Sequence, residues 1–424
     1  MTGESEARSP RRALSVLGPG LVTGAADDDP SGIGTYSQVG AQFGYSMGWA
    51  LVFGFPLLAA IQEICGRIGA VTGRGIAHNL RRHYPRRLLV MAVMLLLIAN
   101  VINLGADLGA MGAALALVLP GPAILFTVLL ALVSILAEVF VPYSRYVHVL
   151  KWATLSLFAY IGVAFVVKVP FDEAAAGLLV PSFRLDRDHA MALVAIFGTT
   201  ISPYLFFWQA GQEVEERHRR HAKPLCITPR SAGPELRRIR ADTLIGMGFS
   251  HITALFILIA TAATLHQVGI RDIGTAAEAA AALEPIAGEQ AALLFALGLV
   301  GTGMLAVPVL AGSAAYALSE TFRWVEGLDR KPREARAFYA TITLATLGGL
   351  AINLTPIDSM KALYWAAVIN GLLAPPLMIL TMLVARNPRI MGRLTISPRL
   401  AFAGWLSTGV MTLVSVIFLY TTLT

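Results

Sequence analysis

Charge and cysteine are both scarce in this sequence. Of its 424 residues only 14% are charged, whereas an ordinary soluble domain carries about 25%. Two isolated cysteines, Cys65 and Cys226, give no support for an iron–sulfur or zinc site. By contrast, 56% of the residues are apolar and the mean hydropathy is +0.67. The composition excludes an ordinary soluble protein and indicates a polytopic membrane protein.

Long apolar runs predict an all-α membrane protein with eleven transmembrane helices, because about 20 apolar residues suffice to cross a bilayer core. We expect residues 1–12 to form a cytosolic tail, since no cleavable signal pattern is present, and residues 13–424 to form a single transmembrane domain. The predicted spans are residues 13–42, 45–70, 88–112, 121–141, 146–168, 190–216, 241–266, 289–320, 335–354, 360–385 and 400–422.

The basic residues predict the orientation of these spans. With the N-terminus in the cytosol, eleven crossings place 28 of the 33 Lys and Arg residues on the inner side, in agreement with the positive-inside bias. This arrangement indicates a multi-pass plasma-membrane protein whose C-terminus lies outside. It also accounts for the net charge of +7 without a nucleic-acid partner. The oligomeric state stays open.

Helix-breaking residues stand in the middle of two predicted spans. The first span contains "DDDPSG", with Pro30 behind three aspartates, and the sixth contains "GTTISPY", with Pro203 near its middle. Proline removes a backbone donor and clashes with the preceding turn. A proline alone is often a simple kink, and an acidic triplet can mark a span end. The two defects lie five spans apart, however, which predicts a 5+5 inverted repeat over about residues 13–168 and 190–385.

Paired discontinuous helices point to the midplane site of a secondary transporter, and the groups at these two breaks are oxygen donors. We predict that a metal ion is held by the Asp29 carboxylate, the Ala26 and Thr199 carbonyls and the Ser202 hydroxyl. Oxygen ligands favour hard cations such as Mg²⁺, Ca²⁺ and Mn²⁺, and no basic residue stands at either break to bind an anion. Further candidates along the path are Thr200, Asp27, Asp28 and Asp107, the last with polar packing as the alternative.

The first break also carries a family resemblance. Gly18-Pro19-Gly20, followed after eight residues by Asp29-Pro30, resembles the first-helix motif of the natural resistance-associated macrophage protein (Nramp) family of divalent-metal transporters. "GTTISPY" is similar to the family's sixth-helix Ala-x-x-Met-Pro-His. The resemblance implies the LeuT fold and a metal-ion substrate, with no cofactor. It also makes Asn370 a candidate, since Asn370 falls close to a metal-contacting glutamine of the family's tenth helix.

Departures from the family pattern indicate the type of ion. Relative to the family, Gly32 replaces an asparagine, Ser202 a methionine, Tyr204 a histidine and Ala110 a glutamate. "SPYLFFWQAGQEVEE" resembles the Nramp-related magnesium transporters. Losing two bulky ligands leaves room for the waters that Mg²⁺ retains, and losing a thioether removes a preference for softer metals. We therefore predict alternating-access transport of Mg²⁺, with Mn²⁺ tolerated, and no proton coupling.

Two other transport functions stay open at this point. One is a proton-coupled Mn²⁺/Fe²⁺ importer of the Nramp type. The other is a sodium-coupled amino-acid symporter on the same fold, which would need unwound amides facing a carboxylate and no acid at the first break. An enzyme is not expected, because no Ser/Lys, His-cluster or paired-Asp constellation stands on adjacent spans. The expected partners are the divalent ion and the lipid bilayer.

Overall fold

The structure is a computed structural model that describes residues 18–141, 157–167, 169–328, 330–355 and 357–423. These residues are mainly helical and contain no strand. The long helices are α4 (Trp49–Thr72), α6 (Arg86–Leu115), α7 (Ala123–Phe140), α13 (Ala232–Thr261), α16 (Ala291–Phe322), α17 (Arg336–Ile352), α18 (Ser359–Arg386) and α20 (Pro398–Leu423). Shorter helices are α5 (Ile76–His83), α9 (Phe158–Val166), α10 (Phe171–Leu179), α14 (Ala276–Ala281), α15 (Glu284–Ala287) and α19 (Pro388–Met391).

Eight helical stretches in the described residues are long and apolar enough to cross a membrane. They correspond to the predicted spans two, three, four, six, seven, eight, ten and eleven. The ninth span is the shorter helix α17, and α9 lies within the fifth predicted span. Residues 146–156 and 168 of that span, the predicted tail at residues 1–12 and the start of the first span lie outside the described residues.

Both predicted helix breaks are confirmed. In the first span α2 (Pro19–Asp27) ends two residues before α3 (Pro30–Phe43) begins, and in the sixth α11 (Arg187–Thr200) ends before α12 (Pro203–Arg219). Each second half starts with proline, whose missing N–H is unneeded at the first helical position and whose ring disfavours helix in the preceding residue. Pro30 and Pro203 therefore favour the start of a new helix at these positions, although Pro56 in α4 and Pro308 in α16 lie inside continuous helices.

The helix pairing has the symmetry of an inverted repeat. Helix α2 packs along α13, and α12 packs along α4, so spans one and seven pair as spans six and two do. Both pairs cross at a glycine: a Cβ on Gly24 would lie 2.2 Å from the Gly246 carbonyl oxygen, and a Cβ on Gly69 would lie 2.2 Å from the Ala210 carbonyl oxygen. Small residues allow such close approach between membrane helices.

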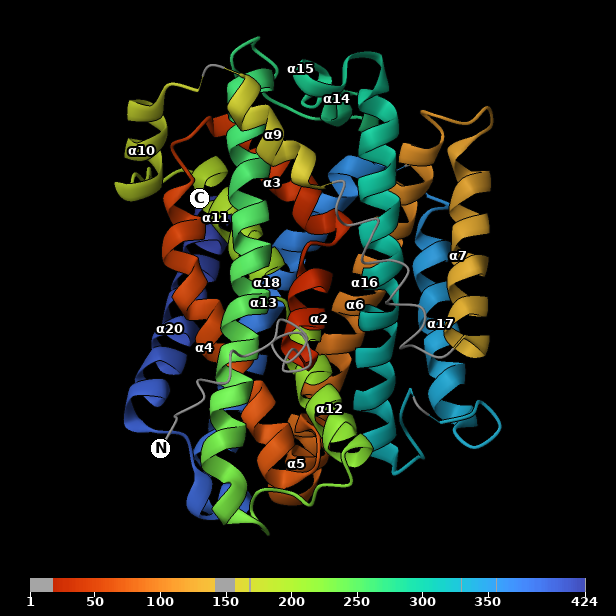
Figure 1. Ribbon diagram of the computed structural model, residues 1–424, viewed down its shortest axis with the longest axis vertical. Coiled ribbons are helices and arrows are strands. Elements are labelled where there is room, and N and C mark those ends of the chain that lie inside the picture. The colour runs from red at the N-terminus through yellow and green to blue at the C-terminus, as the bar shows by residue number, and fades with distance from the viewer. Residues whose placement is uncertain (1–17, 142–156, 168, 329, 356, 424) are drawn as a thin grey trace, which may run out of the picture.

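The four half-helices lie in the interior of the bundle, with α3 above α2 in Figure 1 and the long helices around them. Helix α5, the end of α12 and the start of α13 lie at the lower end of Figure 1, and α10, α14 and α15 lie at the upper end. The two basic segments 67–87 and 217–240 therefore share one end of the molecule. In the view from above, α7 and α17 lie across the bundle from α20.

Candidate metal site

Asp29 occupies the first break and is 1% exposed. Its Oδ1 accepts a 2.7 Å hydrogen bond from the Gly32 backbone N–H, so the residue caps α3. Aspartate is a preferred N-cap because its oxygen satisfies an amide that the helix leaves unpaired. The other carboxylate oxygen, Oδ2, does not take part in capping the helix.

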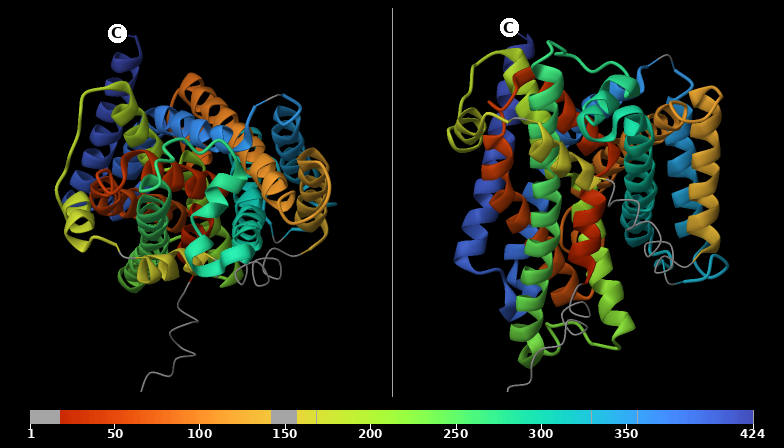
Figure 2. Two further views of the ribbon diagram at one scale, coloured as in Figure 1. Left: turned by 90° about the horizontal axis from the view of Figure 1, so that it is seen from above. Right: turned by 45° about the horizontal axis from the view of Figure 1, so that its top comes forward.

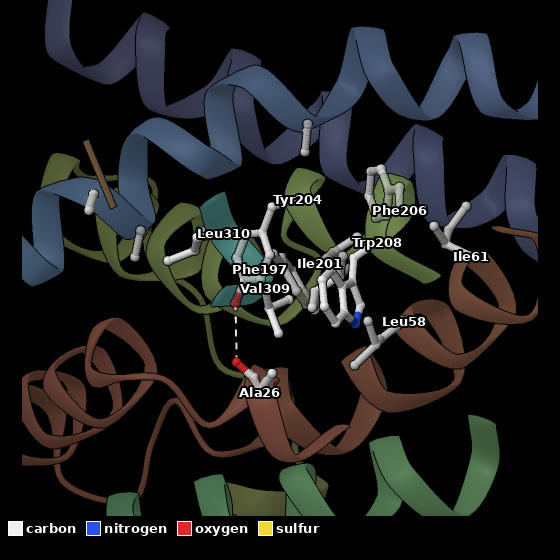
Figure 3. Close-up of a cluster of buried hydrophobic side chains, with 14 of the residues drawn as sticks. Ala26, Leu58, Ile61, Phe197, Ile201, Tyr204, Phe206, Trp208, Val309 and Leu310 are labelled. Atoms are coloured by element: carbon white, nitrogen blue, oxygen red, sulfur yellow. Dashed lines mark hydrogen bonds between the residues drawn. The ribbon is translucent and has the colours of Figure 1, made fainter. Parts of the chain in front are cut away.

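Tyr204, in the first turn of α12, connects the two breaks. Its hydroxyl lies 3.1 Å from Asp29 Oδ2 and 3.3 Å from the Ala26 carbonyl oxygen in the last turn of α2. Figure 3 shows the side chain pointing across to Ala26. Two of the predicted metal ligands, the Asp29 carboxylate and the Ala26 carbonyl, therefore contact the same hydroxyl group. That hydroxyl belongs to Tyr204 on the other broken helix.

The second break presents a different arrangement of its predicted groups. The Ser202 hydroxyl donates back to α11, 2.8 Å from the Thr199 carbonyl oxygen and 2.9 Å from that of Gly198. The Thr200 hydroxyl bonds the Ile196 carbonyl within its own helix at 2.9 Å. Thr199 Oγ1 has no hydrogen-bond partner. Ser202 and Thr199 are thus in contact with each other at the unwound segment, whereas the Thr200 hydroxyl forms a hydrogen bond within its own helix.

Two further candidates come from the long helices. Asp107 on α6 is 0% exposed, and neither of its carboxylate oxygens has a hydrogen-bond partner. Asn370 on α18 donates to Asn103 Oδ1 at 3.1 Å, while its own Oδ1 has no partner. The Asn103–Asn370 pair therefore joins α6 to α18, and Asp107 retains two unused acceptors.

Asp27 and Asp28 lie against α13. The Ser250 hydroxyl is 2.7 Å from Asp27 Oδ2 and 3.0 Å from Asp28 Oδ1. The two aspartates are 0% and 2% exposed. They are therefore directed toward a neighbouring helix and sealed from solvent in this conformation.

The buried charge of this region is entirely negative. Among the described residues, no Lys, Arg or His forms an ion pair with Asp27, Asp28, Asp29 or Asp107. Uncompensated charges in a low-dielectric interior are costly. In the same part of the chain, no three His, Cys, Asp or Glu side chains come close enough to hold a metal together. A cation at Asp29 would be held by one carboxylate supplemented by carbonyls, hydroxyls and water.

The route from this region toward the upper end of Figure 1 is closed by Gln38 on α3. Its side-chain amide donates to the Arg271 carbonyl at 3.1 Å and accepts from the Ile273 N–H at 2.8 Å, which attaches the loop after α13 to the broken helix. A cavity of about 200 Å³ lies beside this contact, lined by Gln38 and by the exposed ion pair of Lys361 and Asp272.

The opposite end is closed by Asp242 on α13. Its two carboxylate oxygens accept the backbone N–H groups of Gly18 at 2.9 Å and Gly20 at 2.7 Å, at the start of α2. Arg238, one turn earlier on α13, bonds the fully buried Glu213 of α12 at 2.6 Å. The half-helices are thus fastened to α13 at this end, and Asp29 is 1% exposed in this conformation.

A sequence profile described as natural resistance-associated macrophage protein-like matches residues 20–421. The chain belongs to the Nramp family. Among curated relatives, the divalent metal cation transporter MntH of Pectobacterium carotovorum subsp. carotovorum is 26% identical over 309 residues, 71% of this chain and 71% of the relative. MntH of Deinococcus radiodurans is 26% identical over 319 residues, 74% of this chain and 71% of the relative.

Solved structures agree on the fold of this Nramp chain. A manganese transporter of Eremococcus coleocola matches with a TM-score of 0.74 at 18% identity, over 98% of this chain and 88% of that protein. A Na⁺-coupled sialic acid symporter matches at 0.57 with 11% identity, over 96% and 89%. Mhp1, a nucleobase-cation-symport-1 family transporter, matches at 0.52 with 14% identity, over 96% and 92%. The predicted all-α membrane architecture, a LeuT-like inverted repeat, is confirmed.

Sequence reasoning missed several groups around the site of this Nramp chain. Ser250 is a single hydroxyl in an apolar span, and only the packing of α2 on α13 brings it to the aspartates. Met111 is also new: a Cβ on Gly303 would lie 2.2 Å from Met111 Sδ and 3.0 Å from Pro30 Cγ, so a thioether lies beside the first break. The i, i+4 spacing from Asp107 was the one signal that could have found Met111.

Proposed function

We propose that this Nramp chain is a secondary transporter that moves divalent metal cations across the membrane by alternating access. The observation that carries the proposal is Asp29, a buried carboxylate at a helix break. One of its oxygens accepts the Gly32 N–H, and the other accepts the Tyr204 hydroxyl, which also lies 3.3 Å from the Ala26 carbonyl oxygen. Intramembrane carboxylates mark ion pathways. The names of the MntH relatives and of the solved manganese transporter support the same class of substrate.

Within that class, we propose Mg²⁺ as the preferred ion, with Mn²⁺ tolerated. Asp29 can offer the oxygen that does not cap α3, and Ser202 and the Ala26 and Thr199 carbonyls supply a few more, all of them hard donors. Mg²⁺ dehydrates reluctantly and usually keeps several waters, so a site with few direct protein ligands suits it. Gly32 and Ser202 leave the space that larger side chains would fill.

Uptake by purified protein in liposomes tests this proposal directly. We expect saturable uptake of Mn²⁺, used as a tracer, that Mg²⁺ inhibits at comparable concentrations because the two ions meet the same oxygen ligands. Protein-free liposomes provide the control. Tight Cd²⁺ binding by calorimetry that Mg²⁺ cannot displace would contradict a hard-ion site, and absence of any divalent uptake would overturn the transport function.

Replacing Ser202 by methionine is expected to change the selectivity. A thioether is a soft donor, so Ser202→Met should raise the uptake of Cd²⁺ or Mn²⁺ relative to Mg²⁺ by about tenfold, which corresponds to ~1.4 kcal/mol. Adding Gly32→Asn should reinforce the effect. A Cβ at position 32 would lie 3.3 Å from the Tyr36 ring, 3.4 Å from the Asp27 carbonyl oxygen and 3.5 Å from Asp29 Oδ1, so the Tyr36 ring has to move by a few tenths of an ångström.

Met111 supplies the control for this selectivity change. Its sulfur already lies beside the first break, so the variant Met111→Leu measures whether an existing thioether contributes to ion choice. We expect Met111→Leu to leave the Mg²⁺/Cd²⁺ ratio unchanged and Ser202→Met to shift it. A shift caused by Met111→Leu, with none caused by Ser202→Met, would place the ion on the α6 side of the break.

We further propose that residues 13–424 form one transmembrane domain with the N-terminus in the cytosol and the C-terminus outside. The shared location of the basic segments 67–87 and 217–240 at one end supports this orientation. Cys226, exposed in the second segment, and Cys65, buried, make a natural probe. A membrane-impermeant maleimide should label Cys226 in inside-out vesicles and leave it unmodified in intact cells, with Cys226→Ser as the control. Labelling of Cys226 in intact cells would show that the orientation is the opposite of the one proposed.

A further inference from the structure

A single hydroxyl group stands between two buried carboxylates on the α13 side of the first break. Ser250 Oγ lies 2.7 Å from Asp27 Oδ2 and 3.0 Å from Asp28 Oδ1. A serine hydroxyl has only one hydrogen to donate. One of these two short oxygen–oxygen contacts therefore has no hydrogen of its own from Ser250, so either a proton on a carboxyl group or a cation must hold it.

Asp27 also has a carboxylate oxygen without a hydrogen-bond partner. Its side chain is 0% exposed, and its Oδ1 has no hydrogen-bond partner. No basic side chain among the described residues pairs with Asp27 or Asp28. A buried carboxylate normally has a charged partner or coordinates a metal, so the free oxygen points to a ligand beside α13.

The charge of the whole break narrows the ways in which it can be neutralised. Asp27, Asp28, Asp29 and Asp107 together carry four carboxyl groups in a solvent-excluded interior. A single divalent ion at Asp29 offsets at most two negative charges. Because buried carboxylates are costly unless they are paired or protonated, a second cation or protons must neutralise the remaining groups.

We propose that Asp27, Asp28 and Ser250 form a second divalent-cation site, separate from the Asp29 site. One oxygen of each aspartate lies within 3.0 Å of the Ser250 hydroxyl. Carboxylate and hydroxyl oxygens are hard donors that suit Mg²⁺ or Mn²⁺. This inference rests on the proposed function, since it assumes that Asp29 receives a divalent ion.

The second site joins α2 to α13. Its two aspartates come from the end of α2 and the break, and its hydroxyl comes from α13, the helix that also caps the start of α2 through Asp242. An ion here would hold the cytosolic half of the first span against α13, as Asp242 does at the other end of α2.

Equilibrium dialysis of the purified full-length protein against Mn²⁺, with the bound metal counted per chain, tests the inference. We expect about two Mn²⁺ per chain at saturation, with dipolar broadening in the electron paramagnetic resonance spectrum because the two ions are close. Asp28→Asn and Ser250→Ala should each reduce the count to one and remove the broadening. Asp29→Asn should also leave one ion, the one bound at Asp27 and Asp28.

The matched control is Thr253→Ala. Thr253 lies one turn along α13, and its hydroxyl bonds only the Phe249 carbonyl of its own helix, at 3.2 Å, so this variant should keep both ions. Each variant is accepted only if it elutes as a single species on gel filtration; if Asp28→Asn fails this criterion, Ser250→Ala decides.

Three results would overturn the second site. One Mn²⁺ per chain in the wild type, lost in Asp29→Asn and kept in Asp28→Asn, would leave the transport proposal intact and mean that a proton bridges Asp27 and Asp28. Two ions in the wild type that both persist in Ser250→Ala and Asp28→Asn would place the second ion elsewhere. No bound Mn²⁺ in the wild type would remove both the second site and the proposed function.

Discussion

Replacing Asp29 by asparagine is expected to abolish saturable divalent uptake while the protein stays folded. Asparagine is as good an N-cap as aspartate, so the contact with the Gly32 N–H survives and only the charge is lost. Removing one partner from a buried charge pair costs about 3–5 kcal/mol, which is ~100-fold or more in affinity. The measurement is initial Mn²⁺ and Mg²⁺ uptake into liposomes at equal protein density.

Asp186 provides a matched control for this substitution. It caps α11 in the same way, accepting the His189 N–H at 2.9 Å, but it is exposed at the end of its helix. Asp186→Asn should therefore leave uptake unchanged. Asp29→Ala, which removes the cap as well, should add a loss of thermal stability of about 1 kcal/mol. Normal uptake by Asp29→Asn would show that the metal site has been misplaced.

Metal uptake is expected to proceed without a matching inward flow of protons. A proton relay through a membrane needs titratable groups spaced along a path, and Tyr204 and Ala110 take the places of two such groups in the family pattern. A divalent ion driven by the membrane potential instead gains roughly 4.6 kcal/mol per 100 mV, twice the value for a single charge. The driving force would then be electrical.

Liposomes loaded with a pH-sensitive dye and held at a negative inside potential provide the measurement. Mg²⁺ or Mn²⁺ added outside should enter without acidifying the interior. Asp107 is the group that could reverse this result, because both of its oxygens are buried and unpaired. Metal-dependent acidification that Asp107→Asn eliminates would restore the proton-coupled importer. If a second ion occupies Asp27 and Asp28, those two residues are unavailable as substitute carriers.

Much of the fold could be predicted because its determinants are local. Pro30 and Pro203 stand where α3 and α12 begin, and a run of about 20 apolar residues spans a membrane regardless of its neighbours. A proline alone does not decide a break, because Pro56, Pro308 and Pro375 lie inside continuous helices. The five-span separation of the two prolines then implied the inverted repeat. Asp29 could be singled out for the same reason, since it directly precedes a proline in an apolar context.

The contacts between distant segments could not be predicted in this way. Ser250 meets Asp27 and Asp28 across more than 200 residues, and nothing in "GMGFSHITALF" distinguishes this serine from one that bonds its own helix. Asp242 and Gln38 likewise look like ordinary polar residues near span ends. Their roles depend on the close crossing of α2 and α13 and on the position of one loop, which only the packed structure supplies.

The two closures described above, Gln38 at one end and Asp242 at the other, also limit the leakage of ions through the protein. Each closure contains two hydrogen bonds, and at about 0.5–1.5 kcal/mol net for each bond, opening either end costs ~1–3 kcal/mol. A difference of that size leaves roughly 0.6–16% of molecules open at a given end, since each ~1.4 kcal/mol is a factor of ten. If the ends open independently, both are open together in at most about 3% of molecules, the product of the two fractions. A continuous aqueous path is therefore rare, and the protein is expected to behave as a carrier that retains the membrane's ion gradients.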